Sequence, residues 1–179
     1  MKKKTYGLGV IVGRFQILHK GHGEIIRAAL EKCGTLVLLI GSSQEQGSYK
    51  NPFSYEQRKE YILKAFPDVR VYPLPDIGVG NCRAWGDYVL DKVTEYCGRR
   101  PDVFLTGTEE RRESWFGDEV EEITLPKTIE ISSSRMKEYL LADDRESFEK
   151  YIEPALRCEY ETMRGAVMEA KDQLQSESI

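Results

Sequence analysis

The chain has 179 residues and a formal net charge of −4, with 40% hydrophobic and 31% charged residues. This composition is typical of a globular protein of about one domain, and it excludes a disordered or fibrous chain. Domains that coat DNA or RNA usually carry a strong positive excess, so the negative balance argues against nucleic acid as a partner. Any phosphate ligand must therefore be bound by basic residues that are concentrated at one site rather than spread over the whole surface.

The four cysteines are widely spaced and form no C-x-x-C pair, which predicts reduced thiols in a cytoplasmic protein. Three lysines near the start are followed by an apolar stretch that runs only from Tyr6 to Val12. No segment approaches the ~18 apolar residues of a membrane span. We therefore expect a cytoplasmic protein with no membrane partner.

Short apolar runs alternate with helical patterns along most of the chain. Runs that are continuously apolar suit strands covered by helices on both faces of a sheet. The predicted strands are Leu8–Val12, Leu36–Ile40, Val69–Leu74, Val103–Leu105 and Val120–Leu125.

Helices are expected between these strands. One begins after His22 and places apolar residues as far as Cys33 on a single face. Ser54–Phe66 opens with the capping-box pattern Ser-x-x-Gln, and Ala84–Cys97 carries an apolar stripe at helical spacing. Alternating strands and helices predict an α/β fold: a single Rossmann-like open parallel sheet with helices on both faces.

From Ser134 onward the pattern is mostly helical, and Pro154 interrupts it. An apolar stripe follows, and it either packs against the sheet or meets a second subunit. Its members are Leu156, Tyr160, Met163 and Val167.

The most specific pattern is the turn Gly13–His22, which follows the first predicted strand and holds both histidines of the chain. The helix after it presents unpaired N–H groups and the positive end of its dipole, and Gly21 lets a ligand approach the backbone. Zinc would need three or four protein ligands, and no further histidine or suitably spaced cysteine is present. The turn therefore predicts phosphate recognition by His19, His22 and Arg14, with a purely structural histidine pair as the alternative.

A second phosphate-binding element is expected at Ile131–Lys137, where three serines precede a helix. The hydroxyls of Ser132, Ser133 and Ser134 can cap that helix and can also face a phosphate. Lys137 lies one turn inside the helix, where it can reach back as a point charge. Serines in such a position often only cap the helix. Because the histidine turn occurs in the same chain, we favour phosphate binding by these serines.

The loop after the second strand is a third candidate. Gly41 permits close approach of a ligand to the backbone, and Ser42 follows it directly. Lys50 offers a flexible cation farther along the same loop. The alternative is an ordinary connection between a strand and a helix.

A fourth candidate precedes the third predicted helix. Trp85 can stack on a planar base, and Asp76 or Asn81 can hydrogen-bond to the edge of that base. Packing in the core is the alternative for the tryptophan.

Together these motifs resemble the His-x-Gly-His nucleotidyltransferase superfamily and, within it, the archaeal-type nicotinamide-mononucleotide adenylyltransferases. The resemblance runs from Gly7 to about Leu156. It implies transfer of AMP from Mg·ATP onto nicotinamide or nicotinate mononucleotide, forming NAD or deamido-NAD and pyrophosphate without a covalent enzyme intermediate. The segments that carry it are Gly13–His22, Ile40–Gln44, Asn51–Arg58, Pro75–Trp85 and Ile131–Ser134.

The resemblance also implies which residues act. It assigns catalysis to His19, His22 and Lys137. Mg²⁺ is expected to be held by the phosphates of ATP rather than by protein ligands. The residues expected to bind ATP are Gly13, Arg14, Phe15, Gln16, Gly21, Lys50, Ser132, Ser133 and Ser134. The residues expected to bind the acceptor are Gly41, Ser42, Asp76, Ile77, Asn81, Trp85 and Gly107.

By the same resemblance, residues 1–142 form the nucleotidyltransferase domain and residues 143–179 a helical extension of it. The expected partners are ATP and a small pyridine mononucleotide. A homo-oligomer is also implied, with the C-terminal apolar stripe as a candidate interface.

The chain departs from the family pattern at three places. Ile17 stands where a proline is usual in the family, and Thr108 where its archaeal-type members carry an asparagine. Lys137 replaces an arginine, and lysine binds phosphate as a single charge rather than through a planar fork. Two alternatives therefore stay open: adenylyl or cytidylyl transfer to another phosphate such as phosphopantetheine, and a nucleotide-sensing domain without turnover.

Overall fold

The computed structural model describes residues 3–80, 82–107 and 115–177. Within them, five parallel strands form one sheet in the order β3-β2-β1-β4-β5. All five predicted strands are confirmed, with ends that shift by a few residues. The strands are β1 Tyr6–Gly13, β2 Cys33–Gly41, β3 Arg70–Leu74, β4 Val103–Thr106 and β5 Glu121–Thr124.

The order of the strands reverses at β1, which pairs with β2 on one side and with β4 on the other. The two loops that leave the carboxyl ends of β1 and β4 therefore separate in opposite directions. In open parallel sheets this switch point is where ligands bind. Gly13 ends β1 and Thr106 ends β4, so both mark this place.

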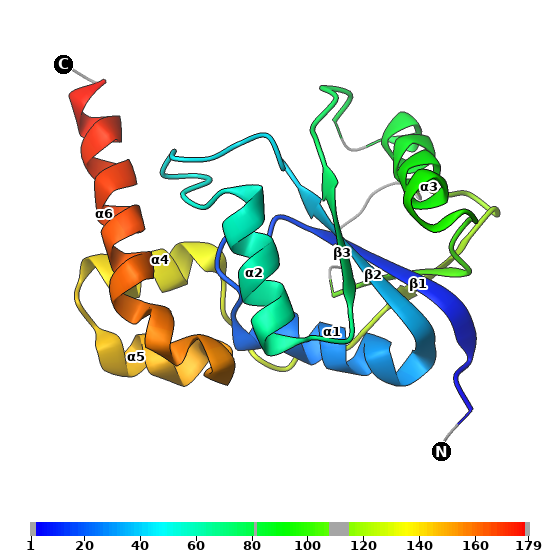
Figure 1. Cartoon of the computed structure of the whole chain (residues 1–179), viewed down its shortest axis with the longest axis horizontal. Helices are drawn as coiled ribbons and strands as arrows, with labels where there is room; N and C mark the ends of the chain where they lie inside the picture. Colours follow the sequence, from blue (N-terminus) through cyan, green and yellow to red (C-terminus); the bar gives the residue numbers. More distant parts are fainter. Residues whose placement is uncertain (1–2, 81, 108–114, 178–179) are drawn as a thin grey trace.

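Helices cover both faces of the sheet, as predicted. Figure 1 shows α4, α5 and α6 grouped at one end of the molecule and α3 at the other. The helices are α1 Lys20–Lys32, α2 Tyr55–Ala65, α3 Arg83–Cys97, α4 Ser133–Leu141, α5 Arg145–Tyr151 and α6 Tyr160–Ser176, with the 3-10 helix η1 at Pro154–Glu159.

The capping box predicted for the second helix is confirmed. The Ser54 hydroxyl accepts a hydrogen bond from the Gln57 N–H at 3.2 Å, and the Gln57 side chain accepts one from the Ser54 N–H at 3.0 Å. The expected position of Cys33 on the first helix is wrong. Its backbone is extended, and it begins β2 instead.

The sheet buries different side chains on its two faces, because successive residues of a strand point to opposite sides. Leu36 and Leu38 of β2 join the larger cluster with α1, α2 and the C-terminal helices. Val37 and Leu39 join the smaller cluster with α3. The continuously apolar β2 thus reflects burial on both sides.

The C-terminal apolar stripe packs inside this chain. Leu156, Tyr160, Met163 and Val167 are all between 0% and 1% exposed and belong to the larger core cluster. Of the two alternatives for the stripe, packing within the chain is therefore confirmed, and these four side chains are not exposed to a second subunit.

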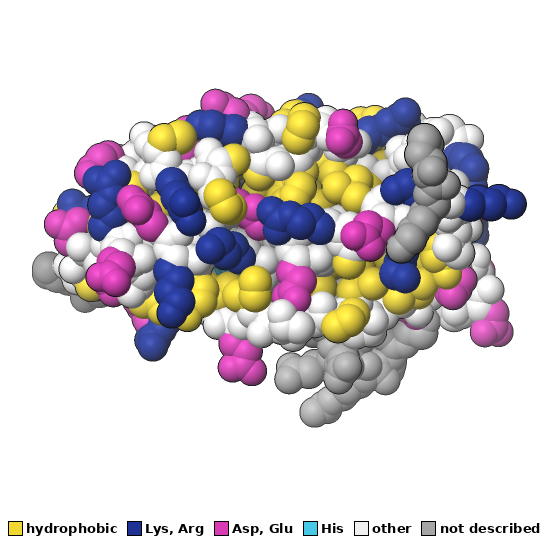
Figure 2. All heavy atoms as spheres, turned by 90° about the horizontal axis from the view of Figure 1, so that it is seen from below, with side chains coloured by type: hydrophobic (Ala, Val, Ile, Leu, Met, Phe, Trp, Pro, Cys, Tyr) yellow, Lys and Arg dark blue, Asp and Glu magenta, His cyan; other side chains and the backbone are white. Residues whose placement is uncertain are grey.

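None of the helices in the described part of the chain combines the length and the apolar character needed to cross a membrane. On the face shown in Figure 2, Lys and Arg side chains are interspersed with Asp and Glu rather than joined in one basic surface.

Candidate active site

A cavity of about 410 Å³ opens at the switch point of the sheet. Its walls come from the turn after β1, the first turn of α1, the end of β4 and the start of α4. A volume in this range suits a small organic ligand. The predicted site residues that line it are Gly13, Arg14, Phe15, His19, Gly21, His22, Gly107, Ser132, Ser133 and Ser134.

The two histidines hold each other in place at the start of α1. The Nδ1 atom of His19 accepts a hydrogen bond from the His22 N–H at 3.3 Å, and the Nδ1 atom of His22 accepts one from the His19 N–H at 3.4 Å. The rings stack with centroids 3.8 Å apart. Because each Nδ1 is an acceptor, the neutral rings carry their protons on Nε2, and these N–H groups are the donors of the pair.

Burial keeps both rings uncharged at neutral pH. It lowers the pKa of His19 to about 4, and the nearby positive charge of Lys127 acts in the same direction. Burial also lowers the pKa of His22 well below its usual value, helped by His19 and Lys127 and opposed by the Ile17 carbonyl. The cavity therefore offers neutral imidazole donors beside a separate cation.

That cation, Lys127, is a lining residue that the sequence analysis missed. It lies in the loop between β5 and α4, outside every motif. A Cβ atom at Gly21 would lie 3.1 Å from its Cε atom and 3.1 Å from the His19 ring. A side chain at this position would have to push the imidazole or the lysine back slightly, so glycine suits the close approach of the turn, the ring and the lysine. The one sequence signal was its place just before the serine run.

Arg58 on α2 ties the loops of the site together and was not predicted as a site residue. Its guanidinium is fully buried and donates to the carbonyl oxygens of Arg14 and Gly41, each at 2.9 Å, and of Ser42 at 3.0 Å. Burial lowers its pKa to about 10, so it remains charged at neutral pH. One side chain thus fixes the turn after β1 against the loop after β2.

Gln16 was expected at ATP, but its amide is turned into the protein. It is 3% exposed, accepts a hydrogen bond from the Phe53 N–H at 3.0 Å and donates to Asn51 Oδ1 at 3.3 Å. It therefore shapes the turn from behind and does not line the cavity.

Lys137 was expected among the phosphates, yet its ammonium group points elsewhere. It donates to the Tyr49 carbonyl at 2.7 Å and lies 4.5 Å from the centre of the Tyr49 ring. Burial, and then the charge of Arg14, lowers its pKa. Lys137 thus joins α4 to the loop after β2. Lys50 is exposed on that loop and, like Lys137, is absent from the cavity lining.

Of the residues expected at the acceptor, Asp76, Ile77 and Trp85 surround a separate hollow of about 340 Å³, whereas Gly107 lines the cavity at the switch point. Asp76 exchanges two hydrogen bonds with Gln44, at 3.2 Å through its carboxylate and at 3.1 Å through its N–H. Asp76 and Ile77 line this hollow, whereas the carbonyls of Gly41 and Ser42 face Arg58. Asn81 lies outside the described residues.

Helix α3, which carries Trp85, is anchored to the edge of the sheet by tyrosines. Tyr88 donates to the Pro75 carbonyl at 2.8 Å, and Tyr96 donates to the Pro73 carbonyl at 2.9 Å. The Trp85 ring itself is half-buried.

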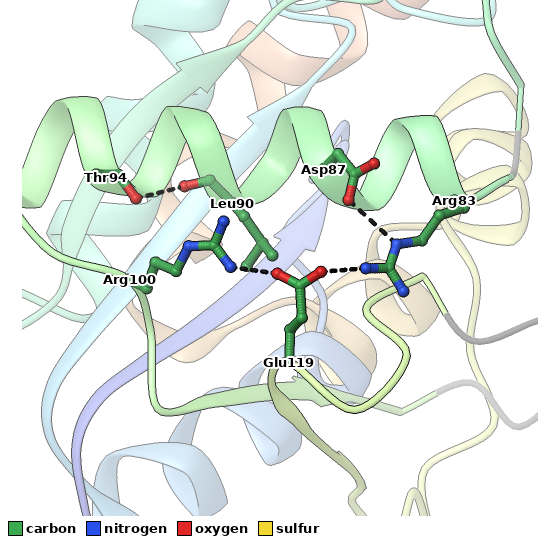
Figure 3. Close-up of polar contacts among 6 residues, drawn as sticks. All are labelled: Arg83, Asp87, Leu90, Thr94, Arg100 and Glu119. Atoms are coloured by element: carbon green, nitrogen blue, oxygen red, sulfur yellow. Dashed lines mark hydrogen bonds and ion pairs between the residues drawn. The ribbon is translucent and has the colours of Figure 1, made fainter.

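Ion pairs fasten the other side of α3. Figure 3 shows Glu119 between Arg83 and Arg100, and Arg83 also pairs with Asp87 at 3.1 Å. Gly86 allows close contact here, because a Cβ atom at this position would lie 1.8 Å from the Trp115 carbonyl oxygen. The start of α3 is thus held between two loops of the sheet.

Among the residues that the structure describes, no group of three or more His, Cys, Asp and Glu side chains is arranged to hold a metal ion. The cavity is instead lined by hydrogen-bond donors: imidazoles, hydroxyls, an arginine and a lysine. An open parallel sheet with such a cavity at its switch point defines a Rossmann-like α/β fold of the nucleotide-binding type.

The chain belongs to the cytidylyltransferase-like family, whose model matches residues 10–139. It is similar to the curated nicotinamide-nucleotide adenylyltransferase of Saccharolobus solfataricus, with 41% identity over 45% of this chain and 50% of the relative. The protein of the same name from Thermococcus kodakarensis is 33% identical over 55% of this chain and 53% of the relative. These matches confirm the resemblance drawn from the motifs. They span only about half the length of either curated relative.

A solved structure supports the fold. The bifunctional NMN adenylyltransferase/ADP ribose pyrophosphatase of Francisella tularensis, complexed with AMP and a manganese ion, superposes with a TM-score of 0.65 at 25% identity. The match covers 76% of this chain and 42% of that protein.

Proposed function

We propose that this protein transfers AMP from Mg·ATP to nicotinamide or nicotinate mononucleotide and releases pyrophosphate. The observation that carries the proposal is the convergence of His19, His22 and the serine run of α4 on one cavity. Two segments far apart in sequence, the turn after β1 and the start of α4, place hydrogen-bond donors suited to phosphate at the switch point of a nucleotide-binding fold. The names of the curated relatives support the same reaction.

In the proposed reaction, an oxygen of the acceptor's phosphate attacks the α-phosphorus of ATP. A new P–O bond forms, the bond from the α-phosphorus to the bridging oxygen breaks, and pyrophosphate leaves with the electron pair. No protein nucleophile is required, because the acceptor phosphate is itself the nucleophile. The protein has to align the two phosphates and stabilise the charge that moves onto the pyrophosphate.

The donors around the cavity fit that task. His19 and His22 offer neutral N–H groups, and the first turn of α1 directs its positive dipole end to the same place. Arg14 and Lys127 add positive charge at the rim. We assign the stabilisation of the leaving pyrophosphate to these groups. Lys137, by contrast, we assign to holding α4 against the loop after β2.

The hollow beside α3 is proposed to receive the base of the acceptor. The half-buried Trp85 ring can stack on a pyridine ring, and the Asp76–Gln44 pair holds the loop that faces it. The proposal includes Mg²⁺ as part of the substrate, which agrees with the divalent ion bound by the Francisella tularensis protein. It also includes a cytoplasmic location, supported by four free cysteines.

The test is to incubate the purified protein with Mg·ATP and one acceptor at a time, and to measure pyrophosphate release. The acceptors are nicotinamide mononucleotide, nicotinate mononucleotide and phosphopantetheine. We expect turnover with at least one pyridine mononucleotide. Release with phosphopantetheine alone would overturn the proposed acceptor. Tight nucleotide binding without turnover on any acceptor would instead indicate a nucleotide sensor.

A further inference from the structure

The segment between α5 and η1 lies directly against the turn that carries the histidines. Ile152 forms an isolated antiparallel bridge with His19, and the Glu153 N–H donates to the Leu18 carbonyl at 3.3 Å. The Lys20 ammonium donates to the Lys150 carbonyl at 2.5 Å. Residues 18, 19 and 20 are therefore each bound by residues of the C-terminal part of the chain.

The side chain of Glu153 adds a buried charge to this contact. The residue is 1% exposed, and its carboxylate forms two parallel hydrogen bonds with Arg27 of α1, at 3.0 and 2.5 Å. Such a two-pronged pair is among the strongest polar contacts that side chains make. A buried carboxylate without that partner would be costly, so Arg27 dictates where Glu153 sits.

Gly23 makes room for the carboxylate on the first turn of α1. A Cβ atom at this position would lie 1.6 Å from the Glu153 Oε1 atom and 2.6 Å from its Cδ atom. A glycine inside a helix costs roughly 0.5–1 kcal/mol relative to alanine. Gly23 directly follows His22, so the helix is weakened at this point. The Glu153 carboxylate fills the space that a side chain at this position would occupy.

We propose that Glu153 is a positioning residue for the catalytic turn. Its carboxylate, seated on Gly23 and bound by Arg27, fixes the first turn of α1 and with it the rings of His19 and His22. The helical segment after residue 142 is on this view part of the active site. The inference rests on the proposed adenylyl transfer, because misplacement of transition-state donors by about 1 Å can cost up to ~10²-fold in rate.

A double-mutant cycle tests the proposal. Glu153→Ala is expected to lower kcat about tenfold and to leave KM for both substrates within about twofold, as loss of alignment should. Gly23→Ala is expected to lower kcat and the melting temperature, because its methyl group displaces the carboxylate. In the Glu153→Ala background, the same Gly23→Ala change should instead raise the melting temperature, since alanine is then simply the better helix former.

Two further variants narrow the interpretation. Glu153→Gln keeps the shape and removes the charge, so it should retain more activity than Glu153→Ala. Glu149→Ala breaks an exposed ion pair with Arg145 on α5 and is the matched control, with unchanged kcat.

The imidazole signals in an NMR spectrum provide a readout that does not depend on activity. The chain has only two histidines, so both signals can be followed in every variant. We expect them to shift in Glu153→Ala and in Gly23→Ala. The double variant should give the signals of Glu153→Ala, because the carboxylate that fixes the rings is absent from both. Unchanged histidine signals and unchanged kcat, together with a lower melting temperature, would overturn the positioning role. If the wild-type protein transfers AMP to no acceptor, the proposed function fails, but these signals still decide whether Glu153 positions the histidines.

Discussion

The turn after β1 and the loop before α3 both follow strands of the same parallel sheet, but they are held in place by different kinds of contact. The turn rests on buried groups such as Arg58, Gln16 and Glu153. In the loop before α3, Ile77 is 46% exposed and Val79 is 42% exposed. Hydrogen bonds and ion pairs near the surface connect this loop and the start of α3 to the rest of the protein.

This difference matches what the proposed reaction requires of each half of the site. Stabilising charge on a reacting phosphate requires donors that are already in place, since reorganising them during the reaction would cost rate. Selecting a planar acceptor by stacking tolerates small movements of the loop. We therefore expect changes on the phosphate side to damage stability or kcat, and changes on the acceptor side to alter KM.

The largest effect is expected from Arg58→Met. Its guanidinium serves five backbone carbonyls, and removing it leaves buried acceptors without a donor. We expect the free energy of unfolding to fall by about 3–5 kcal/mol, measured by urea denaturation. Glu60→Met, at an exposed position of the same helix, should change it by no more than about 0.5 kcal/mol. A loss below about 1 kcal/mol for Arg58→Met would refute the role given to this residue.

His22→Ala is expected to lower kcat by roughly 10²-fold or more while the fold persists, because a transition-state donor is lost. Steady-state pyrophosphate release measures the rate, and thermal unfolding confirms that the variant is folded. A variant as fast as the wild type would show that His22 is only structural.

The buried histidines also predict how stability depends on pH. The folded pKa of His19, about 4, lies below the usual value of 6.5, so the unfolded chain takes up this proton first. The contribution of His19 is therefore complete above pH 6.5 and is lost as the pH falls toward 4. We expect a loss of about 3 kcal/mol, seen as the difference between the wild type and His19→Asn in urea denaturation across this range. Parallel curves for the two proteins would contradict it.

The smallest effect is expected from Trp85→Ala on the acceptor side. We expect KM for the acceptor to rise three- to tenfold, since base–aromatic stacking contributes about 1 kcal/mol or more. The values of kcat and of KM for ATP should stay within about twofold. A fall in kcat without a change in the acceptor KM would place Trp85 on the phosphate side and remove the contrast drawn between the two loops.

Sequence alone determined the parts of this protein that depend on local pattern. The five strands followed from apolar runs, because burial on both faces leaves no polar alternation in a strand such as β2. The capping box at Ser54 was predictable because its partners lie three residues apart. The geometry of the turn that carries the histidines was predictable for the same reason, with His19, Gly21 and His22 inside a single helical turn.

Tertiary structure decided which side chains reach the cavity and which hold it from behind. Lys127 lines the cavity although it belongs to no sequence motif. Lys137 belongs to the serine motif, yet its ammonium group binds the Tyr49 carbonyl instead of lining the cavity. Arg58 and Glu153 act on residues 44 and 126 positions away in the chain. Such contacts depend on how the elements pack, and no spacing within a segment records that packing. The sequence therefore indicated where a site lies, and the fold decided which groups surround the cavity.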